Sequence, residues 1–98
     1  MQYYPEVVQV LALDNKHLAV YFSDGHIKGF DVNPLIEKGG VFQPLKDDKI
    51  FRNRLTVMNG TAAWDIDGNR DETRCVDIDP FELYKAKDID DPLSEKTA

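Results

Sequence analysis

Apolar and β-branched residues dominate the first third of the chain, where they predict two strands. These strands lie at 6–13 and 17–22, and the second alternates between apolar and other positions. The dipeptide Asp24–Gly25 follows, and it is a strong hairpin signal because a two-residue type I′ loop needs positive φ at both central positions. Such a loop pairs Phe22 with Ile27 and places both on one apolar face.

Polar and glycine-rich breaks divide the middle of the chain into short elements. Asn33–Pro34 is expected to cap and start a short helix, and Gly39–Gly40 to end it. The run 41–45 is apolar but contains a proline, so it is expected to be an ordered connector. Asp47 or Asp48 is then expected to cap one more helical turn.

The second half of the chain contains another hairpin and a final helix. Asn59–Gly60 lies between strand-like runs at 55–58 and 61–64, which predicts a second two-residue turn. The run 75–78 is expected to be a short edge strand. Asp79–Lys87 begins with a capping aspartate followed by proline, the usual start of a helix.

These elements predict the α+β class. We expect a small antiparallel sheet made of two hairpins, with short helices that include one near the C-terminus. Residues 1–87 are expected to form a single domain. Residues 88–98 are highly charged and contain few apolar side chains, so they are expected to be a disordered acidic tail.

Composition and charge exclude several classes of function. The 98 residues include 12 Lys and Arg against 18 Asp and Glu, which gives a net charge of −6. Nucleic acids are therefore not expected as partners, because phosphate backbones select basic surfaces. The chain has no apolar run long enough to span a bilayer and no signal sequence, so no membrane association is expected. One cysteine forms no internal disulfide, which favours the reducing cytoplasm.

Candidate catalytic and metal-binding patterns are incomplete. The stretch starting at Asp65 resembles the beginning of an EF-hand calcium loop, but Arg70 occupies the glycine position and Val76 the glutamate position. Cys75 and the two histidines have no spacing typical of zinc sites or of a nucleophile with its base. We therefore expect no catalytic residue, metal or cofactor. Trp64 has two interpretations, a core aromatic residue or an interface anchor.

Three motifs together resemble a known family. They are the turn Phe22–Gly25, the helix start Asp31–Leu35 and the closing segment Asp79–Tyr84, in that order along the chain. Their combination resembles the bacterial domain-of-unknown-function family DUF2442. The resemblance implies a small α+β interaction module without an established catalytic residue. Some members resemble the partner half of gene pairs proposed to be toxin–antitoxin systems. Others carry a helix-turn-helix domain, which this chain lacks.

The leading functional hypothesis is a non-enzymatic acidic module that binds a protein. The partner is expected to be small and basic, and to be neutralised as a toxin is by its antitoxin. The alternative is a regulatory domain that binds a small molecule or a metal. Acidic loops speed the capture of basic partners, so the expected partner surface consists of Trp64, Asp65, Asp67, Asp71 and Glu72.

Overall fold

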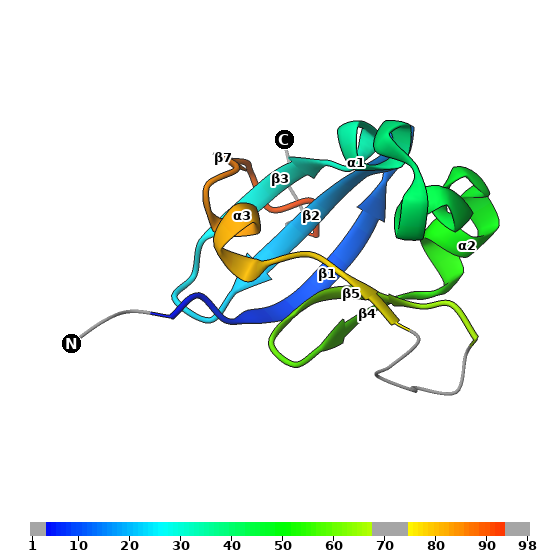
Figure 1. Ribbon diagram of the computed structural model, residues 1–98. Helices are drawn as coiled ribbons and strands as arrows, with labels where there is room; N and C mark the ends of the chain where they lie inside the picture. The colour runs from blue at the N-terminus through cyan, green and yellow to red at the C-terminus, as the bar shows by residue number, and fades with distance from the viewer. Residues whose placement is uncertain (1–3, 68–74, 94–98) are drawn as a thin grey trace.

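Two antiparallel sheets form the framework of the fold in the computed structural model, which describes residues 4–67 and 75–93 (Figure 1). Sheet A has the strand order β1-β2-β3-β7, and sheet B has the order β4-β5-β6. The strands are β1 (Val7–Leu13), β2 (His17–Phe22), β3 (Ile27–Asp31), β4 (Leu55–Met58), β5 (Thr61–Asp65), β6 (Cys75–Asp77) and β7 (Lys87–Asp88). The α+β class is confirmed, with the strands divided between two sheets.

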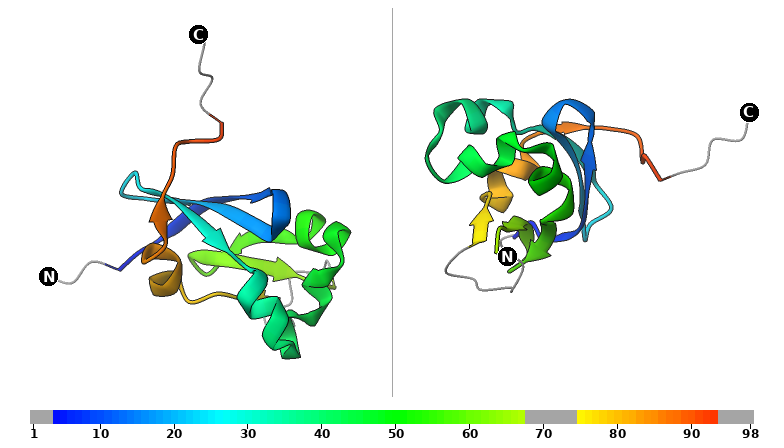
Figure 2. Two further views of the ribbon diagram at one scale, coloured as in Figure 1. Left: turned by 90° about the horizontal axis from the view of Figure 1, so that it is seen from above. Right: turned by 90° about the vertical axis from the view of Figure 1, so that its right-hand side faces the viewer.

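Short helices connect these strands. The α-helices are α1 (Asn33–Lys38), α2 (Asp48–Asn53) and α3 (Pro80–Tyr84), and the 3₁₀ helices are η1 (Asp14–Lys16) and η2 (Gly40–Lys46). In Figure 2 the three α-helices and sheet B lie on one side of strands β1–β3. We call this side the inner face of sheet A and the opposite side its outer face.

The core lies between the inner face of sheet A, sheet B and the helices. Its largest fully buried side chains come from all three parts, namely Leu18, Leu45, Phe51, Trp64 and Leu83. Successive residues of a strand point to opposite faces of the sheet. The outer face therefore carries Leu11, Leu13, Tyr21, Ile27 and Gly29. Along their strands these residues alternate with the ones that point to the inner face.

The second hairpin has the predicted two-residue turn. Met58 pairs with Thr61, and between them Asn59 has φ 53° and Gly60 has φ 74°. Positive φ at both central positions identifies a type I′ turn, whose twist matches that of the flanking strands. The edge strand predicted near residue 75 is also confirmed, as β6.

The first hairpin differs from its predicted register by one residue. The Phe22 amide donates to the His26 carbonyl at 2.9 Å, and the Gly25 amide donates back to the Phe22 carbonyl at 3.0 Å. This is a three-residue loop with Gly25 at φ 96°, the arrangement of a type I turn followed by a glycine bulge. Ile27 consequently pairs with Tyr21 and not with Phe22, so the predicted pairing is wrong.

The corrected register brings a lysine to the inner face. Lys28 pairs with Val20, and only 8% of its surface is exposed. Its ammonium group lies 2.8 Å from an Asp88 carboxylate oxygen and 4.9 Å from the centre of the Tyr84 ring. A buried ammonium needs such partners, since an unpaired charge is costly to remove from water.

Segment 85–93 is ordered over part of the region predicted as a tail. Helix α3 ends at Tyr84, before the predicted end at Lys87, and Lys87–Asp88 pairs with β3 as an edge strand. Of the residues expected to form the tail, Asp88 lies in β7, Ile89 donates its amide to β3, and Asp91 accepts from Tyr21. Residues 94–98 lie outside the described part of the chain.

Beyond β7 the chain packs on the outer face of sheet A. The Ile89 amide donates to the Ile27 carbonyl at 2.9 Å. A Cβ placed on Gly29 would lie 2.7 Å from a methyl group of Ile89, so only glycine leaves room for that side chain. The Tyr21 hydroxyl donates to Asp91 at 2.6 Å; burial, followed by this hydrogen bond, raises the pKa of Tyr21 to about 12.

Helix starts agree with the sequence in two of three cases. The carboxylates of Asp47 and Asp79 each accept a hydrogen bond from the amide two residues on, as predicted for N-caps. At α1 the predicted cap Asn33 is wrong, because Asp31 accepts the amide hydrogen bond of Asn33 instead. The expected connector at 41–45 lies within the 3₁₀ helix η2.

Candidate functional site

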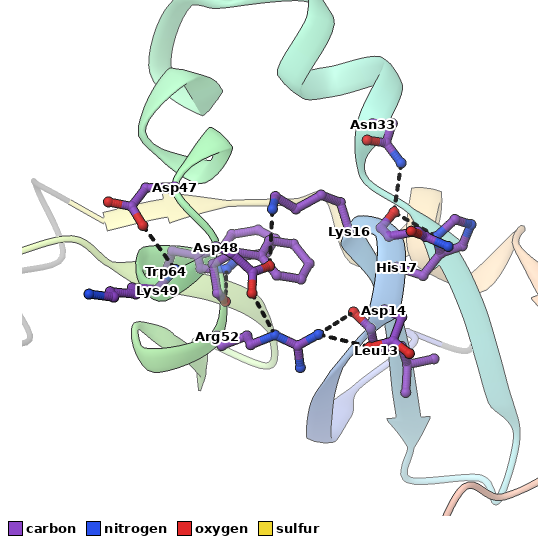
Figure 3. A network of polar contacts seen from close by, with 12 residues as sticks. Leu13, Asp14, Lys16, His17, Asn33, Asp47, Asp48, Lys49, Arg52 and Trp64 are labelled. Atoms are coloured by element: carbon purple, nitrogen blue, oxygen red, sulfur yellow. Dashed lines mark hydrogen bonds and ion pairs between the residues drawn. The ribbon is translucent and has the colours of Figure 1, made fainter.

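The predicted interface anchor Trp64 lies in the core. Its side chain is fully buried, with its ring centre 5.8 Å from that of Phe51. The indole Nε1 donates to the Phe51 carbonyl at 2.9 Å (Figure 3). The core interpretation of Trp64 is therefore the correct one, and this residue cannot supply a surface contact in this fold.

The acidic residues predicted beside Trp64 do not share one environment. Asp65 is buried at the end of β5, while Asp67 is exposed in the turn that follows. Asp71 and Glu72 lie outside the described residues. The described part of the loop therefore offers Asp67 as its exposed carboxylate.

Metal-ligating side chains are not grouped within residues 4–67 and 75–93. No cluster of three or more His, Cys, Asp or Glu side chains with the geometry of a metal site occurs there. Cys75 contacts the Met58 sulfur at 3.3 Å and Asp65 at 3.9 Å in sheet B. His26 instead contacts Asp88 at 3.3 Å in sheet A.

A hollow on the outer face of sheet A was not predicted from the sequence. It has a volume of about 770 Å³ and lies where the turn between β1 and β2 meets β7. Its apolar floor includes Leu13, Gly29 and Ile89, and its polar rim includes Asp14, Asn15, His17, Asp31 and Lys87. We call this feature the outer hollow.

The apolar floor depends on the C-terminal segment. Gly29 has no side chain to fill the space above β3, and Ile89 lies over it. Leu13, at the end of β1, forms the other side of the floor. Neither Leu13 nor Ile89 packs against the main core, so both remain available at the surface.

A tight turn shapes the polar end of the outer hollow. Asn15 and Lys16 both have φ 60°, in the left-handed region, which turns the Asn15 carbonyl toward its neighbours. This carbonyl accepts from His17 Nδ1 at 2.9 Å and from Asn33 Nδ2 at 2.8 Å. A carbonyl can only accept a hydrogen bond, so His17 Nδ1 carries the hydrogen in this contact. The other ring nitrogen, Nε2, lies on the side of Asp31.

Asp31 lies opposite that imidazole. Its Oδ1 accepts from the Asn33 amide at 2.9 Å and from Asn33 Nδ2 at 2.8 Å. Its Oδ2 lies 3.9 Å from His17 Nε2. Desolvation raises the pKa of Asp31, but the two hydrogen bonds from Asn33 and the nearby His17 outweigh it, so the pKa is lowered. The carboxylate is therefore ionised at neutral pH.

A network of ion pairs holds the turn against α2 (Figure 3). Asp48 accepts from Lys16 Nζ at 3.0 Å and from Arg52 Nε at 2.9 Å, and these two bonds lower its pKa. Arg52 also donates to Asp14 at 3.1 Å. The Lys16 ammonium lies 5.4 Å from the centre of the Phe51 ring. The rim of the outer hollow is thus fixed to a helix on the other side of sheet A.

Sequence reasoning had no signal that could find the outer hollow. Its residues come from 12–17, 29–31 and 87–89, and among them only Asp31 belongs to a motif identified in the sequence, where it marks a helix start. Residues 14–16 lie between the strands predicted at 6–13 and 17–22, and the sequence indicates only that they connect the two. No pattern in the sequence around Gly29 or Ile89 indicates that these two residues lie in contact.

Comparison with known proteins identifies one family. Residues 7–88 match the model of a family described as "Protein of unknown function (DUF2442)", which agrees with the resemblance of the three sequence motifs. No curated protein and no solved structure matches the chain. Within the described residues, none of the helices has the length and apolar character needed to cross a bilayer.

Proposed function

Because the chain belongs to the DUF2442 family of proteins of unknown function, we propose its function from the surface that the fold leaves open. It is a non-enzymatic protein-interaction module that binds a small basic protein. Neutralisation of that partner, in the manner of an antitoxin, is the biological role that fits such a module. The proposed surface is the outer face of sheet A and replaces the surface first expected around Trp64.

The outer face itself is the observation that supports this proposal. The helices and sheet B bury the inner face, whereas Leu11, Leu13 and Ile27 remain partly exposed on the outer face. Interfaces between proteins usually combine an apolar centre with a polar rim. Here Leu13 and Ile89 supply apolar surface and the rim of the outer hollow supplies polar groups.

Charge favours a basic partner. The net charge of the chain is −6, and the rim of the outer hollow carries Asp14 and Asp31 against Lys87. Opposite charges on two proteins accelerate their association and suppress wrong pairings, with an effect that salt weakens. A small basic protein with an apolar contact patch matches both properties of this surface.

Quantitative affinity capture from cells of the source organism tests the proposal. The wild-type chain is compared with Leu11→Lys, on the outer face, and with the matched control Val41→Lys, on the exposed part of η2. We expect a small basic protein to be retained by the wild type and by the control, and to be lost from Leu11→Lys. Equal capture by all three chains, or an acidic partner, would contradict the proposed surface.

A small-molecule regulatory domain is the second candidate function. The outer hollow has a volume of about 770 Å³, within the range of roughly 300–1,000 Å³ that is typical of small-molecule sites. A melting-temperature screen against cellular metabolites distinguishes the two candidates, since a ligand that binds the folded state raises its stability. A specific increase that Leu13→Lys abolishes would favour this second function.

A further inference from the structure

We propose that the outer hollow receives a single arginine side chain of the basic partner. This inference rests on the proposed function, and it adds the residue type that the site recognises. The aliphatic part of the arginine lies between Leu13 and Ile89, and its guanidinium group lies between His17 and Asp31.

The polar end of the outer hollow presents a pair of hydrogen-bond acceptors. His17 Nδ1 donates to the Asn15 carbonyl, so in the neutral imidazole Nε2 is an acceptor. Asp31 Oδ2 is also an acceptor, and it lies 3.9 Å from that nitrogen. A donor placed beside both atoms could therefore hydrogen-bond to both of them. A guanidinium group presents several N–H donors in one plane and can serve both.

The outer hollow combines an apolar floor with a charged end. Arginine has a hydrocarbon stem that packs on apolar surface while its head stays polar. The floor at Leu13, Gly29 and Ile89 suits the stem, because Ile89 lies over Gly29 and presents an apolar side chain to the hollow beside Leu13. A purely apolar side chain would leave the carboxylate at the end without its counter-charge.

The Asp31 carboxylate is preorganised for binding. Asp31 Oδ1 is held by two hydrogen bonds from Asn33, which fix the orientation of Oδ2. The ion pair between Lys16 and Asp48 holds the tight turn that carries Asn15. A rigid acceptor loses little conformational entropy when a ligand binds. Asp14, which accepts a hydrogen bond from Arg52, is the second carboxylate at the rim.

Titration with an arginine analogue, followed by amide chemical shifts, tests the inference. The probe is N-acetyl-arginine amide, and its matched control is N-acetyl-citrulline amide, which has nearly the same shape without the charge. We expect saturable shifts at the amides of Leu13, Asn15, Gly29 and Ile89 with the arginine probe. The citrulline probe should produce much smaller shifts at these positions.

Two substitutions in the outer hollow and one control outside it make the test specific. Asp31→Asn keeps an oxygen for the Asn33 amide but removes the charge, and it should weaken binding of the arginine probe about fivefold. Asp14→Asn, on a side chain that is 95% exposed, should weaken it about twofold with little effect on stability, because its ion pair with Arg52 is exposed to solvent. Asp67→Asn makes the same charge change in an exposed turn and should leave the affinity unchanged.

The outcomes separate this inference from the proposed function. Shifts outside the outer hollow, equal shifts with citrulline, or equal weakening by Asp67→Asn would overturn the arginine site even if affinity capture yields a basic partner. Conversely, saturable shifts confined to the outer hollow, with an affinity that Asp31→Asn weakens about fivefold, would support the arginine site. The capture experiment alone decides whether the partner is a basic protein.

Discussion

The contact between Gly29 and Ile89 provides the sharpest test of the fold, because it ties the end of the chain to the outer face of sheet A. Replacing Gly29 by alanine places a Cβ 2.7 Å from the Ile89 Cγ2 atom, closer than two carbons can approach. Overpacking of this kind costs about 1–2 kcal/mol where the neighbour is only partly buried, as Ile89 is.

A second effect opposes the steric cost. Alanine within a strand is favoured over glycine by about 0.5–1 kcal/mol, since it loses less conformational freedom on folding. Gly29→Ala in the wild-type chain should therefore lower the free energy of unfolding by about 0.5–1 kcal/mol. In an Ile89→Ala background the clash is absent, and the same substitution should stabilise the protein by about 0.5 kcal/mol.

Urea denaturation of the four proteins in this double-mutant cycle measures the coupling. The change of sign between the two backgrounds is the expected result, with a coupling of about 1–2 kcal/mol. Leu93→Ala, on an exposed residue of the same segment, serves as the control and should show no coupling with Gly29→Ala. If Gly29→Ala has the same effect in both backgrounds, Ile89 does not lie on Gly29.

Four further predictions address the core, the turns, acid stability and metal binding. Trp64→Phe removes the donor to the Phe51 carbonyl and should cost about 1–3 kcal/mol in urea denaturation, whereas an exposed tryptophan would cost almost nothing. Gly60→Val should cost more than about 1 kcal/mol, because a β-branched residue resists φ 74°; a neutral effect would contradict the type I′ turn. The hydrogen bond from Lys28 is the main cause that lowers the pKa of Asp88 below its ordinary 3.8. The ionised Asp88 therefore contributes its full stabilisation above that value and loses it as the pH falls through the lower pKa of the folded state. Asp88→Asn should accordingly make the free energy of unfolding depend less on pH in the acid range. Calcium at millimolar concentration should leave the melting temperature unchanged; an increase of several degrees would revive the metal-binding alternative.

The sequence by itself determined the features that depend on neighbouring residues. The Asn59–Gly60 turn is set by backbone conformations that these two residues adopt at low cost. The caps at Asp47 and Asp79 each need one carboxylate and an amide two residues away. Interactions within so few residues form with little loss of chain entropy, and their sequence signals are correspondingly reliable.

The tertiary structure decided the register of the first hairpin. Asp24–Gly25 is compatible both with a two-residue type I′ loop and with a three-residue loop that has glycine at the bulge. The observed choice brings Lys28 to the inner face, where its partner Asp88 is supplied by a strand 60 residues further along the chain. No local pattern contains that partner, so the register could not be read from the hairpin alone.

The same reason explains the fate of the predicted partner surface and the origin of the outer hollow. Trp64 is a residue type common at interfaces, and acidic residues follow it in the sequence. In the folded chain its indole nitrogen donates to the Phe51 carbonyl of α2 in the core. The outer hollow exists only because Ile89 returns to Gly29 and the turn at Asn15 approaches Asp31. Burial and long-range contact are properties of the packed chain. Residue type and spacing specify which groups are present, and packing decides which of them meet and which remain at the surface.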